Sequence, residues 1–165
     1  MSWPSSDTAL GQLMARFPRL GTVEWIGVRP ARDVAMIEAD EVLAVVGKGL
    51  VGDRYKGGSG KRELTVIQAE HLPVIATLAG LGSVQPATLR RNLVVSAIPV
   101  IAFKGRRFRI GNVVLEGTSP CDPCSRMETA LGPGGYNAMR GMGGLCVRII
   151  EGGVIRRGDA VVALD

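Results

Sequence analysis

The sequence predicts a mainly β fold of the α+β type, in which a mostly antiparallel β-barrel carries a few peripheral helices. Eight short runs rich in β-branched residues are each bounded by Gly, Pro or Asp, as strands between tight turns usually are. The chain has 23 glycines and only 4% aromatic residues, which favours many turns over long helices. These runs do not alternate regularly with helical segments, so a doubly wound parallel sheet is not expected.

The elements follow from local patterns in chain order. A short amphipathic helix is expected over residues 7–16, with Ser6 or Asp7 as its N-cap. Two further helices are expected, one at 69–80 and a brief one after Cys124. The glycine-rich segment 47–63 is the expected mobile loop. The expected strands are 22–28, 41–46, 63–67, 92–98, 106–110, 113–118, 145–150 and 159–165.

Length and composition indicate one well-cored domain, since the 165 residues are 46% hydrophobic and 21% charged. No window approaches the roughly 20 apolar residues of a membrane-spanning helix. The N-terminus lacks a basic start followed by an apolar core and a cleavage site, so we expect a cytoplasmic protein with no membrane partner. Three cysteines, an odd number, then argue against a disulfide framework and for metal or thiol chemistry.

The charge pattern predicts an oxyanion ligand. The formal net charge is +5, and sixteen of the twenty basic residues are Arg, whose planar fork can hold a phosphate or carboxylate with two hydrogen bonds. Nucleic acid is the obvious alternative partner for a basic chain. The basic residues are dispersed among acidic ones, with no long run and no aromatic platform, so nucleic-acid binding is not expected.

The stretch TSPCDPCSRMET, residues 118–129, contains a C-x2-C pair that is compatible with several kinds of site. A zinc site would need all three cysteines and the single histidine, His71, to converge. Cys146 lies in the apolar run LCVRII, where a cysteine usually acts as a small hydrophobic residue, so zinc is not expected. A thioredoxin-like redox pair would require a strand–helix–strand context that is missing here. Two structural loop cysteines remain an open alternative.

Local sequence favours Cys124 over Cys121 as a reactive sulfur. Ser125 and Glu128 have the S-x-x-E spacing of a capping box, which would start a helix at Arg126 and leave Cys124 directly before its positive end. Both the helix end and the Arg126 side chain would stabilise a thiolate. A thiolate attacks electrophiles or binds a soft metal. Cys121 would be a neighbour or a resolving thiol.

Six segments together resemble the MOSC domain, named for the C-terminal part of molybdenum-cofactor sulfurases. The likeness runs from about residue 20 to residue 165, which divides the chain into an N-terminal helical extension, 1–20, and a MOSC domain, 21–165. It implies a β-barrel and a link to the molybdenum cofactor, a pterin with a phosphate and a dithiolene-bound metal. The segments are GLVGDR (49–54), RELTVIQAEHL (62–72), RRNLVVSAI (90–98), CDPC (121–124), GMGGLCVRII (141–150) and GGVIRRGD (152–159).

The resemblance also implies site residues. The second cysteine of C-x2-C ligates molybdenum in the reducing members of the family, which corresponds here to Cys124. The R-x-N element that relatives use on the cofactor corresponds to Arg90, Arg91 and Asn92. The expected cofactor-binding set is Gly52, Asp53, Arg54, Arg62, Arg90, Arg91, Asn92 and Asp122.

The chemistry of these residues suits such a ligand. Arg54, Arg62, Arg90 and Arg91 offer forks for a pterin phosphate or carbonyl. Gly52 would let backbone amides approach the anion closely, and Asp53 is expected to orient Arg54.

Two functions of different kind follow from this expectation. The first is a molybdenum-dependent oxidoreductase that reduces N-hydroxylated small molecules and takes its electrons from a partner protein. The second is a sulfur carrier, in which Cys124 holds a persulfide received from a cysteine desulfurase. No intrinsic pyridoxal phosphate, flavin or zinc is expected in either case. A barrel that binds some other small anionic ligand remains as a third outcome, and the oligomeric state is left open.

Overall fold

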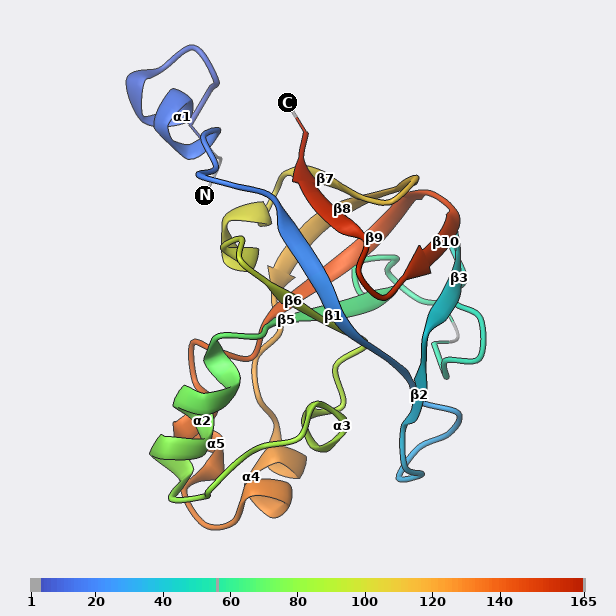
Figure 1. Cartoon of the computed structure of the whole chain (residues 1–165), viewed down its shortest axis with the longest axis vertical. Helices are drawn as coiled ribbons and strands as arrows, with labels where there is room; N and C mark the ends of the chain where they lie inside the picture. The colour runs from blue at the N-terminus through green and yellow to red at the C-terminus, as the bar shows by residue number, and fades with distance from the viewer. Residues whose placement is uncertain (1–3, 56, 165) are drawn as a thin grey trace.

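A closed β-barrel of mixed strand direction forms the centre of the molecule (Figure 1). The computed structural model describes residues 4–55 and 57–164. Pairing of Gly21 with Val161 closes the barrel between its first and last strands. Around the barrel the strands run β1 (Gly21–Val28), β6 (Leu93–Ser96), β5 (Leu64–Gln68), β9 (Leu145–Glu151), β8 (Val113–Pro120), β7 (Arg107–Ile110) and β11 (Ala160–Ala163).

The barrel is mixed because β5 and β6 pair in parallel, with Val66 opposite Leu93. The other barrel pairings given for the described residues are antiparallel, so the expected strand direction is only loosely right. Parallel neighbours need a crossover connection. This crossover contains α2 (His71–Ala79) and α3 (Pro86–Leu89), and it carries the chain away from the barrel and back.

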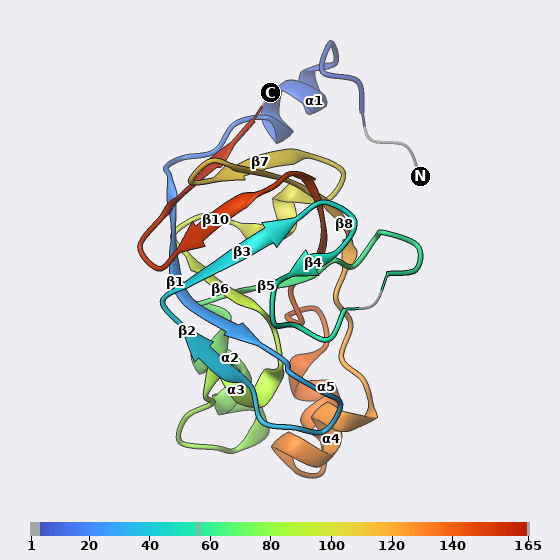
Figure 2. The ribbon, with the colours of Figure 1, turned by 90° about the vertical axis from the view of Figure 1, so that its right-hand side faces the viewer.

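All eight expected strands are present, with ends that differ by a few residues. The sequence did not indicate the short strands β2 (Ile37–Ala39), β4 (Gly49–Leu50) and β10 (Gly153–Arg156). β2 extends the sheet beside β1, while β10 and β4 flank the expected strand β3 (Glu41–Val45) in a second small sheet (Figure 2). β4 lies within the expected loop 47–63, of which Lys56 is outside the described residues, as is Asp165 at the end of the last expected strand.

A layer of helices covers one end of the barrel, opposite to α1 (Figures 1 and 2). It consists of α2, α3, α4 (Ser125–Leu131) and α5 (Gly135–Met139). A second apolar core joins this layer to the outside of β5 and β6, through Ile67, Ile75, Val94 and Met127 among others. This packing fixes where α4 begins relative to the barrel. Among the described residues no helix is long and apolar enough to cross a membrane.

The N-terminal helix is shorter than expected and has a different cap. α1 covers Ala9–Met14, and the Thr8 hydroxyl caps it by accepting the Gly11 N–H over 3.0 Å, so neither Ser6 nor Asp7 is the N-cap. The apolar face of α1 does not pack on the barrel, since Leu13 is 62% exposed. Division of the chain at residue 20 stays a prediction.

Three aromatic rings attach the N-terminal segment to the barrel core. Phe17 stacks on Phe103 with ring centroids 4.9 Å apart, and Phe103 stacks on Phe108 at 4.3 Å. Phe103 belongs to a 3-10 turn, η1 (Val100–Phe103), and its side chain is fully buried. It is the shared member of both ring contacts, so it links the N-terminal segment to the interior.

Removing the Phe103 ring should therefore be costly. We expect Phe103→Ala to lower the free energy of unfolding by about 3–5 kcal/mol, because it leaves a cavity among packed side chains. Leu13→Ala, in the exposed face of α1, should change it by no more than about 0.5 kcal/mol. Urea unfolding measures both, and equal effects of the two substitutions would contradict this account of the core.

Candidate functional site

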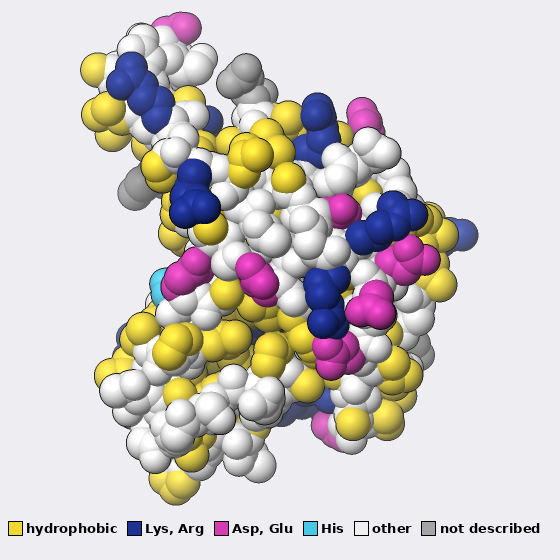
Figure 3. Space-filling view, viewed as in Figure 1, with side chains coloured by type: hydrophobic (Ala, Val, Ile, Leu, Met, Phe, Trp, Pro, Cys, Tyr) yellow, Lys and Arg dark blue, Asp and Glu magenta, His cyan; other side chains and the backbone are white. Residues whose placement is uncertain are grey.

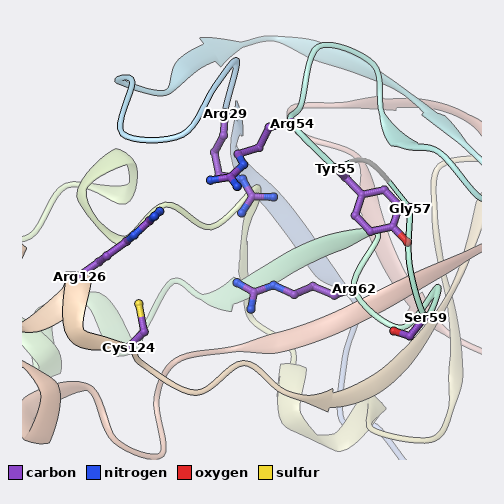
Figure 4. A pocket seen from close by; sticks show the side chains of 8 residues that line it. All are labelled: Arg29, Arg54, Tyr55, Gly57, Ser59, Arg62, Cys124 and Arg126. Atoms are coloured by element: carbon purple, nitrogen blue, oxygen red, sulfur yellow. The ribbon is translucent and has the colours of Figure 1, made fainter.

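A cavity of about 550 Å³ opens between the barrel and the start of α4. This volume is in the range of small-molecule sites. Three parts of the chain form its wall: the end of β1, the segment after β4, and the N-terminus of α4 (Figure 4). The lining residues are Arg29, Arg54, Tyr55, Gly57, Ser59, Arg62, Cys124 and Arg126.

Cys124 is the cysteine that lines this cavity. It is exposed and free, and Figure 4 shows its thiol in the space between Arg62 and Arg126. Cys124 itself is the N-cap of α4, with extended backbone angles of φ −128° and ψ 179°. The expected position directly before the positive end of a helix is therefore confirmed.

The prediction of a capping box, which led to this expectation, is wrong. Ser125 is the first residue of α4 rather than its N-cap, and the cap makes no side-chain hydrogen bond. Glu128 turns instead to the next helix, where its carboxylate accepts the N–H groups of Tyr136 at 2.8 Å and Gly134 at 2.7 Å. These two bonds lower the pKa of Glu128. Glu128 thus anchors the start of α5 against α4.

Positive charge gathers around the cavity. Besides the four arginines of its wall, Arg90 lies close enough that the charges of Arg29, Arg126 and Arg54 lower its pKa, after burial as the larger cause. On the face shown in Figure 3, basic and acidic side chains are interspersed. Elsewhere than in the cavity wall, arginines form ion pairs such as Arg156–Glu41 and Arg157–Glu38. In the cavity the same-sign charges converge, and such a field attracts anions.

Asp53 holds one of these arginines in place. Its carboxylate accepts the Arg29 backbone N–H at 2.8 Å and two guanidinium N–H groups, from Nε at 3.1 Å and Nη2 at 2.8 Å. The Asn92 amide donates to the same carboxylate over 3.1 Å. Burial alone would raise the pKa of Asp53, but the Arg29 and Asn92 contacts outweigh it and the pKa is lowered. Asp53 therefore orients Arg29, and the expectation that it orients Arg54 is wrong.

Asn92 connects several segments behind the cavity through its hydrogen bonds. It is fully buried, and its amide donates to the Gly27 carbonyl as well as to Asp53. Its carbonyl accepts from both the backbone N–H and the hydroxyl of Thr65. All of its hydrogen-bonding capacity is thus used within the protein, across β1, β5 and β6.

Arg91 is also built into the structure. Only 4% of it is exposed, and its guanidinium donates to the carbonyls of Gly143, Leu89 and Cys121 at 2.8–3.2 Å. Arg90, with a left-handed φ of 56°, donates to the carbonyls of Val34 and Ala31 in the loop after β1. Both arginines therefore shape the surroundings of the cavity through backbone carbonyls.

The residues expected at the site fall into two groups: those that line the cavity and those that hold the surrounding segments in place. Arg54, Arg62 and Cys124 line the cavity. Asp53, Arg90, Arg91 and Asn92 hold the segments around it. Gly52 has a φ of 90°, which its turn requires, and Asp122 is exposed and outside the lining set. Whether each of them contacts a ligand stays a prediction.

Arg29, Tyr55 and Ser59 line the cavity but were not singled out from the sequence. Arg29 had a signal, since it is a charged residue directly after a strongly apolar strand and before Pro30. Tyr55 and Ser59 had none beyond their place in the glycine-rich segment.

The donor set fits a cofactor that brings both an anion and a metal. Arginine forks suit a phosphate, and an exposed cysteine facing them suits a soft metal ion. Across residues 4–55 and 57–164, no three His, Cys, Asp or Glu side chains cluster as metal ligands. A metal held by Cys124 would therefore take its remaining ligands from the cofactor.

The family model of the MOSC domain matches residues 52–162, more than half of the chain. The chain therefore belongs to the MOSC domain family, which is associated with the molybdenum cofactor. The resemblance drawn from six sequence segments is confirmed. A search among curated protein sequences found no match.

Solved structures share this fold. The YuaD protein from Bacillus subtilis has a TM-score of 0.76 at 18% identity, covering 88% of this chain and 97% of its own. YiiM from Escherichia coli has a TM-score of 0.70 at 20% identity, covering 90% of this chain and 71% of its own. YiiM from Geobacillus stearothermophilus has 0.67 at 18% identity, covering 88% and 75%. At such identities the likeness establishes the fold.

The network around Asp53 can be tested through pH. Asp53→Asn keeps its shape and removes its charge, so we expect a loss of about 1.5–3 kcal/mol in unfolding free energy at neutral pH. The folded-state pKa lies below the ordinary 3.8, so the charged form stabilises the fold above that value. This contribution is lost as pH falls through the folded-state pKa. Urea unfolding of both proteins should show their difference shrinking there; a constant difference would exclude this role for Asp53.

Proposed function

We propose that the cavity binds the molybdenum cofactor, with Cys124 as the protein ligand to the metal, and that the bound cofactor serves the reduction of N-hydroxylated small molecules. The observation that carries this proposal is the exposed Cys124 thiol on a wall shared with four arginines. A thiol alone would suit many reactions. A thiol facing a cluster of phosphate-binding forks suits a ligand that carries both a phosphate and a metal.

Each part of the wall has a distinct task in this proposal. Arg54 and Arg62 bind the phosphate with their free forks, while Arg29 presents a guanidinium already fixed by Asp53. A fixed side chain loses little rotamer entropy when the ligand arrives, which favours binding. Tyr55 lies along the same wall and offers a flat face to a pterin ring.

The chemistry divides between the cofactor and the chain. When bound, the cofactor supplies a metal that can exchange an oxygen atom and two electrons with a substrate. Cys124, in the cavity wall, would hold that metal, and the positive wall would stabilise anionic groups there. We propose no flavin or iron–sulfur centre in this chain, so the electrons would come from a partner protein.

Metal and pterin content test this proposal directly. The chain should be expressed in cells that make the cofactor, and molybdenum and pterin measured after purification. We expect stoichiometric molybdenum in the unaltered chain and its loss in Cys124→Ser, because a hydroxyl does not replace a thiolate as a soft ligand. Arg62→Ala should reduce the pterin content as well, because it removes a phosphate contact.

Matched variants separate the site from general effects. Cys121→Ser alters a buried sulfur outside the cavity and should keep its molybdenum, and Arg16→Ala removes an exposed charge near α1 and should keep its pterin. If Cys124→Ser and Cys121→Ser hold equal amounts of metal, Cys124 is not the ligand. A chain without molybdenum and pterin would leave the third reading, a barrel that binds another anion.

The difference in exposure among the three cysteines favours a second function. Cys121 and Cys146 are buried, whereas Cys124 is exposed and so accessible to a donor protein. In this alternative Cys124 receives a persulfide from a cysteine desulfurase and delivers the sulfur to a metal centre elsewhere. Transfer from a donor persulfide to Cys124 leaves the donor as a thiol and extends Cys124 by one sulfur.

Mass spectrometry distinguishes this carrier from the oxidoreductase. After incubation with a cysteine desulfurase and cysteine, a carrier should gain the mass of one sulfur at Cys124, since this exposed thiol is the one that a donor protein can reach. Cys124→Ser should gain nothing, and the reductant dithiothreitol should remove the added sulfur. An unmodified Cys124 in the presence of an active desulfurase would exclude the carrier.

A further inference from the structure

Cys121 and Cys146 lie side by side, Cys146 on β9 and Cys121 directly after the end of the neighbouring strand β8. Ser119 of β8 pairs with Cys146 of β9, and the Cys121 N–H then donates to the Gly144 carbonyl over 2.8 Å. Residues two apart on an extended strand point to the same face. Cys121 is therefore a diagonal neighbour of Cys146, and Gly144, opposite Cys121, has no side chain to separate the two sulfurs.

The two thiols lie close enough to affect each other's ionisation, and both cysteines are free and buried, Cys146 at 5% and Cys121 at 1% exposure. The Cys146 thiol also donates to the Pro120 carbonyl over 4.0 Å. The neighbouring Cys146 thiol lowers the pKa of Cys121 to about 6 against the effect of burial, with help from Arg91 and Arg62. The proximity of Cys121, together with burial, raises the pKa of Cys146. One sulfur is thus the more nucleophilic, and the other is its natural resolving partner.

Neither sulfur lines the cavity, so the pair has no task in the function proposed above. We propose that Cys121 and Cys146 form a redox-modification site, a dithiol that a hydroperoxide oxidises to an intramolecular disulfide. A disulfide requires the sulfurs to approach to about 2.05 Å, and the strand register already places the two side chains as diagonal neighbours on one face. The proposal goes beyond cofactor binding and does not depend on it.

The reaction has two balanced steps. The Cys121 sulfur attacks the peroxide, breaks its O–O bond, becomes a sulfenic acid and releases water. The Cys146 sulfur then attacks the Cys121 sulfur, which forms the S–S bond and releases a second water. Two thiols lose two electrons and two protons in total, and one hydrogen peroxide is reduced to two waters.

Peptide mapping tests the pairing in the unaltered chain. The protein is oxidised with graded hydrogen peroxide, its free thiols are blocked in denaturant at low pH, and it is digested with trypsin without reduction. Cleavage after Arg109 and Arg126 yields one peptide that contains both Cys121 and Cys124, and cleavage after Arg140 yields a separate peptide with Cys146. We expect these two peptides to be linked, with the loss of two hydrogen masses.

The same map identifies the competing outcomes. A disulfide between Cys121 and Cys124 would stay within one peptide, and oxidation of Cys124 alone would add oxygen without a link. Either result, or no link at any peroxide concentration that oxidises Cys124, overturns the proposal. The Cys124→Ser variant should retain the link, whereas Cys146→Ser should lose it.

A second measurement does not depend on any variant. A disulfide between Cys121 and Cys146 closes a loop of the chain and restricts its unfolded state, so the oxidised protein should unfold at higher urea than the reduced one. Dithiothreitol should return the urea midpoint to that of the reduced protein. An oxidised sample with linked peptides and a lower midpoint would show a strained artefact, and would also overturn a native redox site.

Discussion

The buried contact between Asp53 and Arg29 is the interaction on which the arrangement of the site depends. One carboxylate, with no exposed side-chain surface, receives hydrogen bonds from Arg29 at the end of β1 and from Asn92 at the start of β6. Asn92 in turn joins Thr65 of β5. A charge buried in this way is stable only while its partners remain in place, so the network fixes the turn after β4 against three barrel strands. It also fixes the orientation of the Arg29 guanidinium in the cavity wall.

The remaining cavity charges have fewer partners. Asp53 neutralises Arg29, and among the described residues the ion pair given for Arg126 is a long contact of 3.7 Å with the exposed Asp33. Like charges held together repel one another, and an anion bound among them would reduce that repulsion. On the outer surface, by contrast, arginines form exposed ion pairs such as Arg156–Glu41.

Three cysteines of one chain acquire different chemistry from their surroundings. Cys124 is exposed at the first turn of α4, where a ligand or a partner protein can reach it. Cys121 and Cys146 are buried neighbours, and each shifts the pKa of the other, lowering that of Cys121 and raising that of Cys146. The spacing C-x2-C suggests a pair within the motif, but the strand register joins Cys121 to the distant Cys146 instead.

The sequence by itself determined the strands, because alternating and β-branched runs bounded by turn residues reflect local backbone preferences, and it identified the position of Cys124 before a helix. Only the tertiary structure decided which side chains meet. The parallel β5–β6 pair, the Asp53–Arg29 contact and the Cys121–Cys146 contact join residues far apart in the chain. Glu128 shows the same limit at short range: its spacing from Ser125 fits a capping box, yet the folded chain offers it the free N–H groups of α5. Local pattern fixes what an element is, whereas barrel closure and helix packing fix its neighbours, because those contacts arise only when distant segments are brought together.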